Sequence, residues 1–94
     1  MPVAVLSLYL KFSGCTSLKE KRSQIKPLVA RLQREFNLSV AEMDLLDRWR
    51  EGVVACAVIS NDGGQCQRVL QSVIEFTQHH FPDVEIAEHH IEFI

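Results

Sequence analysis

Apolar and polar residues alternate with a period of two over residues 3–12, near the start of the chain. This alternation is typical of a strand with one buried face. The parity predicted to face the core is wholly apolar and consists of Ala4, Leu6, Leu8, Leu10 and Phe12. The parity predicted to face outward consists of Val3, Val5, Ser7, Tyr9 and Lys11.

The pattern changes to a helical period after a turn at residues 13–16. Ser17 is placed as an N-cap, with Glu20 three residues later as its capping-box partner. Pro27 falls on the solvent side of this helix, where its missing N–H costs least, so we predict a helix that continues through it with a bend. The apolar arc of the helix is Leu18, Ile25, Leu28, Val29, Leu32 and Phe36.

Two more strands and a second helix follow from the same reasoning. Residues 38–44 predict a strand, and residues 53–60, which are apolar at both parities, predict a central strand covered on both sides or nearly so. After a turn at residues 61–64, a helical period runs over residues 64–80 and ends before Pro82.

The last strand is predicted over residues 84–93, but its alternation changes phase. Val84 and Ile86 share one parity, whereas Ile91 and Phe93 share the other. A β-bulge near His89 would return both pairs to the same face.

The element order βαββαβ predicts an α+β fold of the ferredoxin-like type, with one domain over residues 1–94. Its four-stranded antiparallel sheet would have the first and third strands at its centre and both helices on one face. The other face would stay open and carry Val3, Val5 and Tyr9. Because an apolar face of this kind usually contacts a partner, we predict an interface there, used for homodimerisation through the sheet or for pairing of edge strands. The alternative is that Tyr9 and the valines are merely half-exposed.

Basic residues are concentrated in the first third of the chain. Residues 1–34 carry seven Lys and Arg side chains against Glu20 alone, whereas residues 35–94 carry three Arg side chains against eleven carboxylates. The net charge of −2 therefore hides a strong polarity. This asymmetry predicts an electropositive face on an acidic body, which suits a local contact with an anion better than indiscriminate nucleic-acid binding.

Two segments supply candidate anion- or RNA-binding residues. In the first helix Lys19, Arg22 and Lys26 project to one side, beside the apolar arc, and a helix N-terminus favours anions. The alternative for these residues is a well-capped, solvated face. The loop before the third strand adds a tryptophan flanked by arginines, which either contacts a partner or covers the core. The full set is Lys19, Lys21, Arg22, Lys26, Arg48, Trp49 and Arg50.

Other chemistry finds little support in the sequence. Three cysteines without Cys-x-x-Cys spacing predict reduced thiols in a cytoplasmic protein. His89 and His90 point to opposite faces of a strand, and His79 and His80 suit the end of a helix. We therefore expect no metal, no cofactor and no catalytic site. No apolar run approaches about 20 residues and the N-terminus has no basic region, so we expect neither a membrane span nor a signal peptide.

Four short motifs occur in order along the chain: Ser17-Leu18-Lys19-Glu20-Lys21-Arg22, Asn37-Leu38-Ser39-Val40-Ala41-Glu42, Asp47-Arg48-Trp49 and Ser60-Asn61-Asp62. Together they resemble the YlxP-like family of small bacterial proteins of unknown function, over essentially the whole chain. The resemblance implies the ferredoxin-like fold. Members are often encoded beside translation-initiation and ribosome-maturation factors, which implies a ribosome-linked role. The family assigns no catalytic residue, and it draws attention to Lys19, Lys21, Arg22, Glu42, Asp47 and Trp49.

We therefore predict a cytoplasmic, non-enzymatic accessory protein that contacts the ribosome or structured RNA through the surface of the first helix. The alternative is a homodimeric interaction module that uses the open sheet face. A third hypothesis is a regulator or enzyme that binds a phosphorylated ligand at the N-terminus of the first helix.

Overall fold

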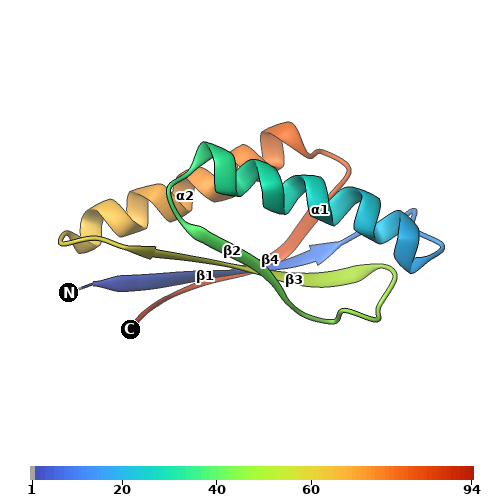
Figure 1. Cartoon of the computed structure of the whole chain (residues 1–94), viewed down its shortest axis with the longest axis horizontal. Helices are drawn as coiled ribbons and strands as arrows, with labels where there is room; N and C mark the ends of the chain where they lie inside the picture. Colours follow the sequence, from blue (N-terminus) through green and yellow to red (C-terminus); the bar gives the residue numbers. More distant parts are fainter. Residues whose placement is uncertain (1) are drawn as a thin grey trace.

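The computed structural model describes residues 2–94 and has two layers, a sheet and a pair of helices (Figure 1). Its element bounds differ from the predicted ones by two residues at most, and the predicted βαββαβ order is confirmed. The elements are β1 (Val3–Lys11), α1 (Leu18–Glu35), β2 (Ser39–Asp44), β3 (Glu51–Ile59), α2 (Gly63–His80) and β4 (Glu85–Phe93).

The four strands form one antiparallel sheet in the order β2-β3-β1-β4. As predicted, β1 and β3 are the central strands. Both helices cover the same face of this sheet (Figure 1). The architecture is therefore the predicted ferredoxin-like α+β sandwich, and the sheet is open rather than closed into a barrel.

The core lies between the helices and the covered face of the sheet. The side chains of β1 that point toward the helices are buried along the whole strand, as the alternation of its residues predicts. A fully buried leucine contributes roughly 1.5–3 kcal/mol relative to an exposed one, so this layer is the main source of stability. The largest apolar side chains that are fully buried are Phe12, Leu6, Leu8, Leu10, Ile25, Leu28, Leu32 and Leu70.

The first helix continues through Pro27, as predicted, and this residue is exposed. Proline has no N–H, so the carbonyl of Ser23, four residues earlier, lacks its helical donor. Ser23 and Pro27 are both exposed, so water can reach this break in the hydrogen-bond ladder.

The predicted β-bulge in the last strand is confirmed, two residues before the expected position. Tyr9 pairs with Glu88 and Leu10 pairs with Ile86, so Ala87 is the extra residue. The bulge returns Ile86 and Ile91 to the helix-covered side, where both pack against the core.

A second bulge interrupts the pairing of β2 with β3 at Met43. The sequence analysis did not predict it, because β2 is too short for a change of phase to show.

The strand register identifies the third-strand residues on the open face. Tyr9 lies opposite Val53 and Val5 lies opposite Ala57, so the set Val53, Ala55, Ala57 and Ile59 shares the open face with the outward parity of β1. The helices cover only one side of this strand, so the expectation that it is covered on both sides holds at Val53, which is buried, and fails at Ile59, which is 60% exposed.

Candidate functional site

The start of α1 and the loop of residues 45–50, called here the β2–β3 loop, lie at one end of the molecule, away from the two termini (Figure 1). Two hydrogen bonds tie this loop to the connection between β1 and α1. The Phe12 N–H donates to the Arg50 carbonyl at 2.9 Å, and Arg50 Nε donates to the Cys15 carbonyl at 3.0 Å. The structure therefore brings together the two segments that supplied the candidate anion-binding residues.

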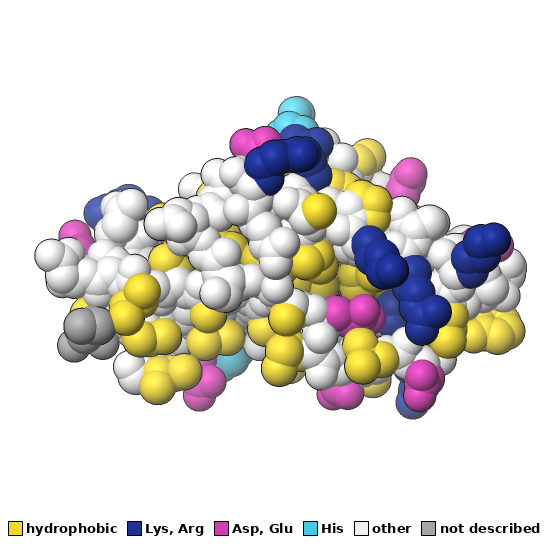
Figure 2. Space-filling view, in the orientation of Figure 1, with side chains coloured by type: hydrophobic (Ala, Val, Ile, Leu, Met, Phe, Trp, Pro, Cys, Tyr) yellow, Lys and Arg dark blue, Asp and Glu magenta, His cyan; other side chains and the backbone are white. Residues whose placement is uncertain are grey.

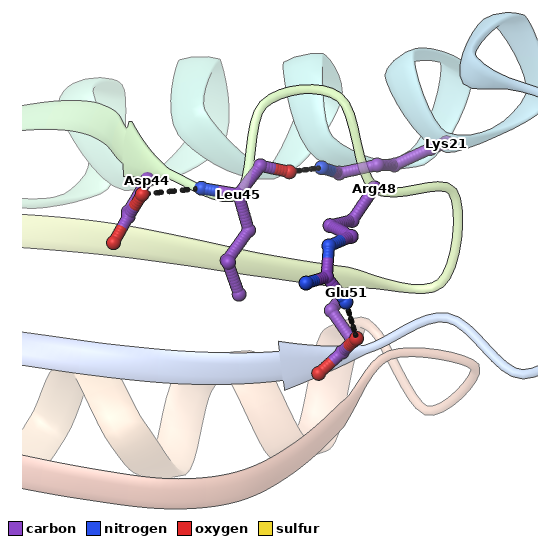
Figure 3. Close-up of polar contacts among 5 residues, drawn as sticks. All are labelled: Lys21, Asp44, Leu45, Arg48 and Glu51. Atoms are coloured by element: carbon purple, nitrogen blue, oxygen red, sulfur yellow. Dashed lines mark hydrogen bonds and ion pairs between the residues drawn. The ribbon is translucent and has the colours of Figure 1, made fainter.

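Lys21 crosses from α1 to the β2–β3 loop inside the protein (Figure 3). Only 1% of it is exposed, and its Nζ donates to the Leu45 carbonyl at 2.8 Å. The same Nζ lies 3.2 Å from Glu42 Oε2. A buried ammonium needs such partners, since burying it alone costs several kcal/mol. The prediction that Lys21 contacts an external anion is therefore corrected: its charge is satisfied internally, and it anchors the loop.

The loop begins with an unusual backbone conformation at Leu45. Its φ is 59°, in the left-handed region that leucine rarely adopts. Such a residue costs of order 1–3 kcal/mol and persists only where its surroundings hold it. Here its N–H donates to Asp44 Oδ1 at 2.8 Å, and its carbonyl accepts from Lys21 Nζ and from the Arg48 N–H (Figure 3). The loop therefore has a fixed starting point.

The remaining loop candidates, Arg48, Trp49 and Arg50, are all exposed, but they differ in the contacts that their side chains already make. Arg48 Nη1 lies 3.2 Å from Glu51 Oε1, and both side chains are exposed, so this pair is weak and its arginine can exchange partners. Arg50 is partly committed to the Cys15 carbonyl. Trp49 is 50% exposed, so it does not lie down as a full cover over the core. The exposed half of Trp49 is open to a partner.

Lys19, Arg22 and Lys26 form the basic stripe, the name kept here for these three residues. All three are exposed, and within residues 2–94 none of them takes part in a salt bridge. Spaced over seven helical residues, they span roughly 10 Å along α1. Lys and Arg side chains gather over the N-terminal half of this helix (Figure 2).

The N-terminus of α1 is capped by its own residues. Ser17 Oγ accepts from the Glu20 N–H at 3.1 Å. This bond confirms Ser17 as the N-cap, but the return half of the predicted capping box differs: the Glu20 carboxylate accepts from the Thr16 N–H at 3.3 Å and from Thr16 Oγ1 at 2.6 Å, one residue before the N-cap. The helix N-terminus thus already carries a carboxylate beside it, which makes it less attractive to a second anion. This geometry argues against a phosphorylated ligand at that point.

Glu20 gives the molecule a pH-dependent helix cap. Its hydrogen bonds from the Thr16 hydroxyl and backbone lower the pKa of the Glu20 carboxyl. The cap therefore contributes fully above the unfolded pKa of about 4.3, and is lost as pH falls through the lower folded value. We expect Glu20→Gln to melt at a lower temperature than the parent at pH 6 and to approach it at pH 3. A difference that stays constant between these pH values would contradict this account.

A hollow of about 290 Å³ between the helices and the loop before β4 contains Ser23, His80 and Asp83 in its lining. These residue types suggest nucleophilic catalysis, but their hydrogen bonds go elsewhere. The Ser23 hydroxyl donates to the Glu20 carbonyl at 2.6 Å, and His80 Nδ1 lies 3.2 Å from the Phe76 carbonyl. The hollow therefore shows no activated nucleophile.

The described residues hold no metal-binding cluster, and their thiols are buried. Among residues 2–94, no group of three or more His, Cys, Asp or Glu side chains is arranged to hold a metal ion. Cys15, Cys56 and Cys66 are free and buried. Burial raises the pKa of the Cys56 thiol to about 12 and also raises that of Cys15. At neutral pH these two are protonated thiols, which are poor nucleophiles and poor metal ligands.

No helix in the described part of the chain is long and apolar enough to cross a membrane. The fold and the surface together define a small ferredoxin-like α+β protein with a basic helix and an open apolar sheet face. Residues 3–91 match the family described as a protein of unknown function, DUF503. The chain belongs to this family.

A curated relative supports the same assignment. The chain is 36% identical over 69 residues to the uncharacterized protein YlxP of Bacillus subtilis (strain 168), a match that covers 73% of this chain and 74% of the relative. The resemblance to the YlxP-like family is thereby confirmed.

A solved structure repeats the fold. The de novo designed protein Foldit4 matches with a TM-score of 0.57 over all of this chain and 97% of its own. At 14% identity this likeness concerns the fold alone.

Proposed function

We propose that this protein is a non-enzymatic, cytoplasmic accessory protein that binds RNA, in the ribosome or in another structured RNA, through the basic stripe. The observation that carries the proposal is the set of three exposed cations, Lys19, Arg22 and Lys26, which lack carboxylate partners within residues 2–94. Cations that are already paired would have to break those pairs before they could bind phosphate.

The stripe has the physical properties of a phosphate contact. Its residues lie on a continuous helix, so their spacing is fixed before binding and little order is lost. Contacts of this kind position a protein on a nucleic-acid backbone without reading its sequence. Trp49, at the same end of the molecule, adds a half-exposed ring on which an unpaired base could stack.

The remainder of the surface would orient the complex. The chain carries a net charge of −2, so most of the molecule repels RNA and only the α1 side attracts it. Binding should therefore occur in one orientation and depend steeply on salt, because each phosphate contact releases a counterion.

The test is co-sedimentation with ribosomes and their separated subunits at low and high salt. We expect the wild-type protein to bind at low salt and Lys19→Glu/Lys26→Glu to bind at least tenfold more weakly. Arg34→Glu/Arg68→Glu changes the net charge equally, at exposed sites outside the stripe, and should bind nearly as well as wild type. Wild-type protein that stays in the supernatant at low salt, or equal losses in both variants, would contradict the proposal.

A further inference from the structure

The open sheet face, meaning the side turned away from α1 and α2, has a shallow trough at its centre. A hollow of about 290 Å³ lies there, and small side chains form its floor. The register places Ala57 beside Val5 and Ser39, and Ala55 beside Ser7 and Ala41, so the small residues of adjacent strands lie in rows. The hollow is lined by Val5, Ser39, Val40, Ala41, Met43, Ala55 and Ala57.

Large apolar side chains stand at both ends of this trough. At one end Ile59, 60% exposed, lies opposite Val3, and the Ile94 N–H donates to the Val3 carbonyl at 2.8 Å. At the other end Met43 is 62% exposed and Tyr9 is 41% exposed. Hydrophobic side chains follow the lower margin of the molecule, where this face is seen edge-on (Figure 2). The open face thus has a central hollow between two raised apolar ends, a shape that suits the binding of a partner.

One border of the trough carries glutamates along β4, with His90, opposite Ser7, between two of them. Glu88 lies opposite Tyr9 and Glu92 lies opposite Val5, so both carboxylates project on the open face along β4. Glu85, opposite Lys11, extends the same line. All three glutamates are exposed, and within residues 2–94 none of them belongs to a salt bridge.

We propose that the open face binds a basic amphipathic helix of another polypeptide. The apolar side of that helix would fill the trough between the Ile59 and Met43 ends, and its lysines or arginines would lie along the glutamates of β4. Glu88 and Glu92 are four positions apart along the strand, a distance of roughly 13 Å. Basic residues about two turns apart on one flank of a helix match that spacing.

A second copy of this chain fits the same face less well. If two sheets pack face to face about an axis perpendicular to the strands, β4 lies over the partner's β4 and the glutamates repel one another. If the axis runs parallel to the strands, β4 lies over the partner's β2. The open-face residues there are Ser39, Ala41 and Met43, which offer no cation. Neither arrangement neutralises the glutamates of β4.

This interaction would be independent of RNA binding by α1, because the helix layer and the open face are opposite surfaces of the molecule (Figure 1). The protein could then hold an RNA backbone on one side and a basic protein segment on the other.

The test uses two synthetic 18-residue amphipathic helices with identical leucine faces, one flanked by lysines and one by glutamates. Each is titrated into the isotopically labelled full chain and followed by amide NMR shifts. We expect the lysine peptide to bind at least tenfold more tightly, with shifts at Tyr9, Ala55 and Ala57 and little change in α1. Glu88→Lys/Glu92→Lys should reverse the preference between the peptides. Glu75→Lys/Asp83→Lys, with the same charge change on other exposed sites, should retain it.

Several outcomes would overturn the inference. These are equal affinity for the two peptides, shifts that map to the helices, a preference that the Glu88/Glu92 change does not alter, and no binding at millimolar peptide. Sedimentation equilibrium of the protein alone provides a further measurement. A micromolar dimer that Ala57→Glu dissociates would show that a second copy occupies the face instead.

Discussion

Replacing Lys21 with methionine is expected to lower the free energy of unfolding by roughly 3 kcal/mol. Methionine keeps an unbranched apolar stem of similar length, so the packing around the side chain changes little. The ammonium is lost, and with it the hydrogen bond to the Leu45 carbonyl and the ion pair with Glu42. Glu42 is 24% exposed and can turn to water, which places the cost at the lower end of the range for broken buried pairs.

Urea denaturation of Lys21→Met beside Lys19→Met measures this effect with a matched control. Lys19 is exposed and unpaired in the described chain, so its replacement should change stability by about 0.5 kcal/mol or less. A double-mutant cycle with Glu42→Gln isolates the pair itself. If Lys21→Met and Lys19→Met cost the same, the internal anchor contributes nothing and the strained Leu45 backbone must be held by other contacts.

The strands and helices could be predicted because each carries its own period. The alternation of residues 3–12 identified both the buried and the open face of β1, and the structure agrees at every position of the strand. The conflict of phase between Ile86 and Ile91 was sufficient to predict a bulge, because no straight strand can bury both. Strand β2 is too short to show a change of phase, so its bulge at Met43 was found only in the structure.

The prediction that Lys21 binds an external anion failed for a different reason. At 100° per residue it lies about 300° from Leu18, between Leu28 and Leu32 and therefore inside the apolar arc. The helical position therefore indicated burial, whereas the residue type suggested an exposed cation. Position outweighed type because Glu42 and the Leu45 carbonyl supply partners from a strand and a loop that are distant in sequence. A lysine within the apolar arc of a helix thus predicts an internal ion pair.

The left-handed backbone conformation of Leu45 could not have been predicted from residue type. Positive φ is associated with glycine and asparagine, and nothing in a leucine indicates it. One of the three hydrogen bonds at Leu45 comes from Lys21, 24 positions away, and local sequence does not encode that contact. The basic stripe, in contrast, followed from helical spacing alone, and the structure leaves all three of its residues exposed.

Replacing Gly52 with valine is the second change for which we expect a large effect, about 2–3 kcal/mol of destabilisation. A Cβ at this buried position in β3 would lie 3.3 Å from each of three side-chain carbons, in Phe12, Lys21 and Ile25. The two further methyl groups of valine would push into the same cluster. Valine favours strands over glycine, so any loss of stability must come from overpacking rather than from local propensity.

Gly14 provides the control for this substitution, because no atom lies within 4 Å of a Cβ built there. Gly14→Val should therefore change the free energy of unfolding by only about 0.5 kcal/mol. Overpacking at Gly52 should also displace the Lys21 stem and weaken its bond to Leu45, so amide exchange in the β2–β3 loop should accelerate in Gly52→Val alone. Equal stability losses at the two glycines, or a loop whose exchange is unchanged in Gly52→Val, would mean that the Lys21 stem does not depend on the space that Gly52 leaves beneath it.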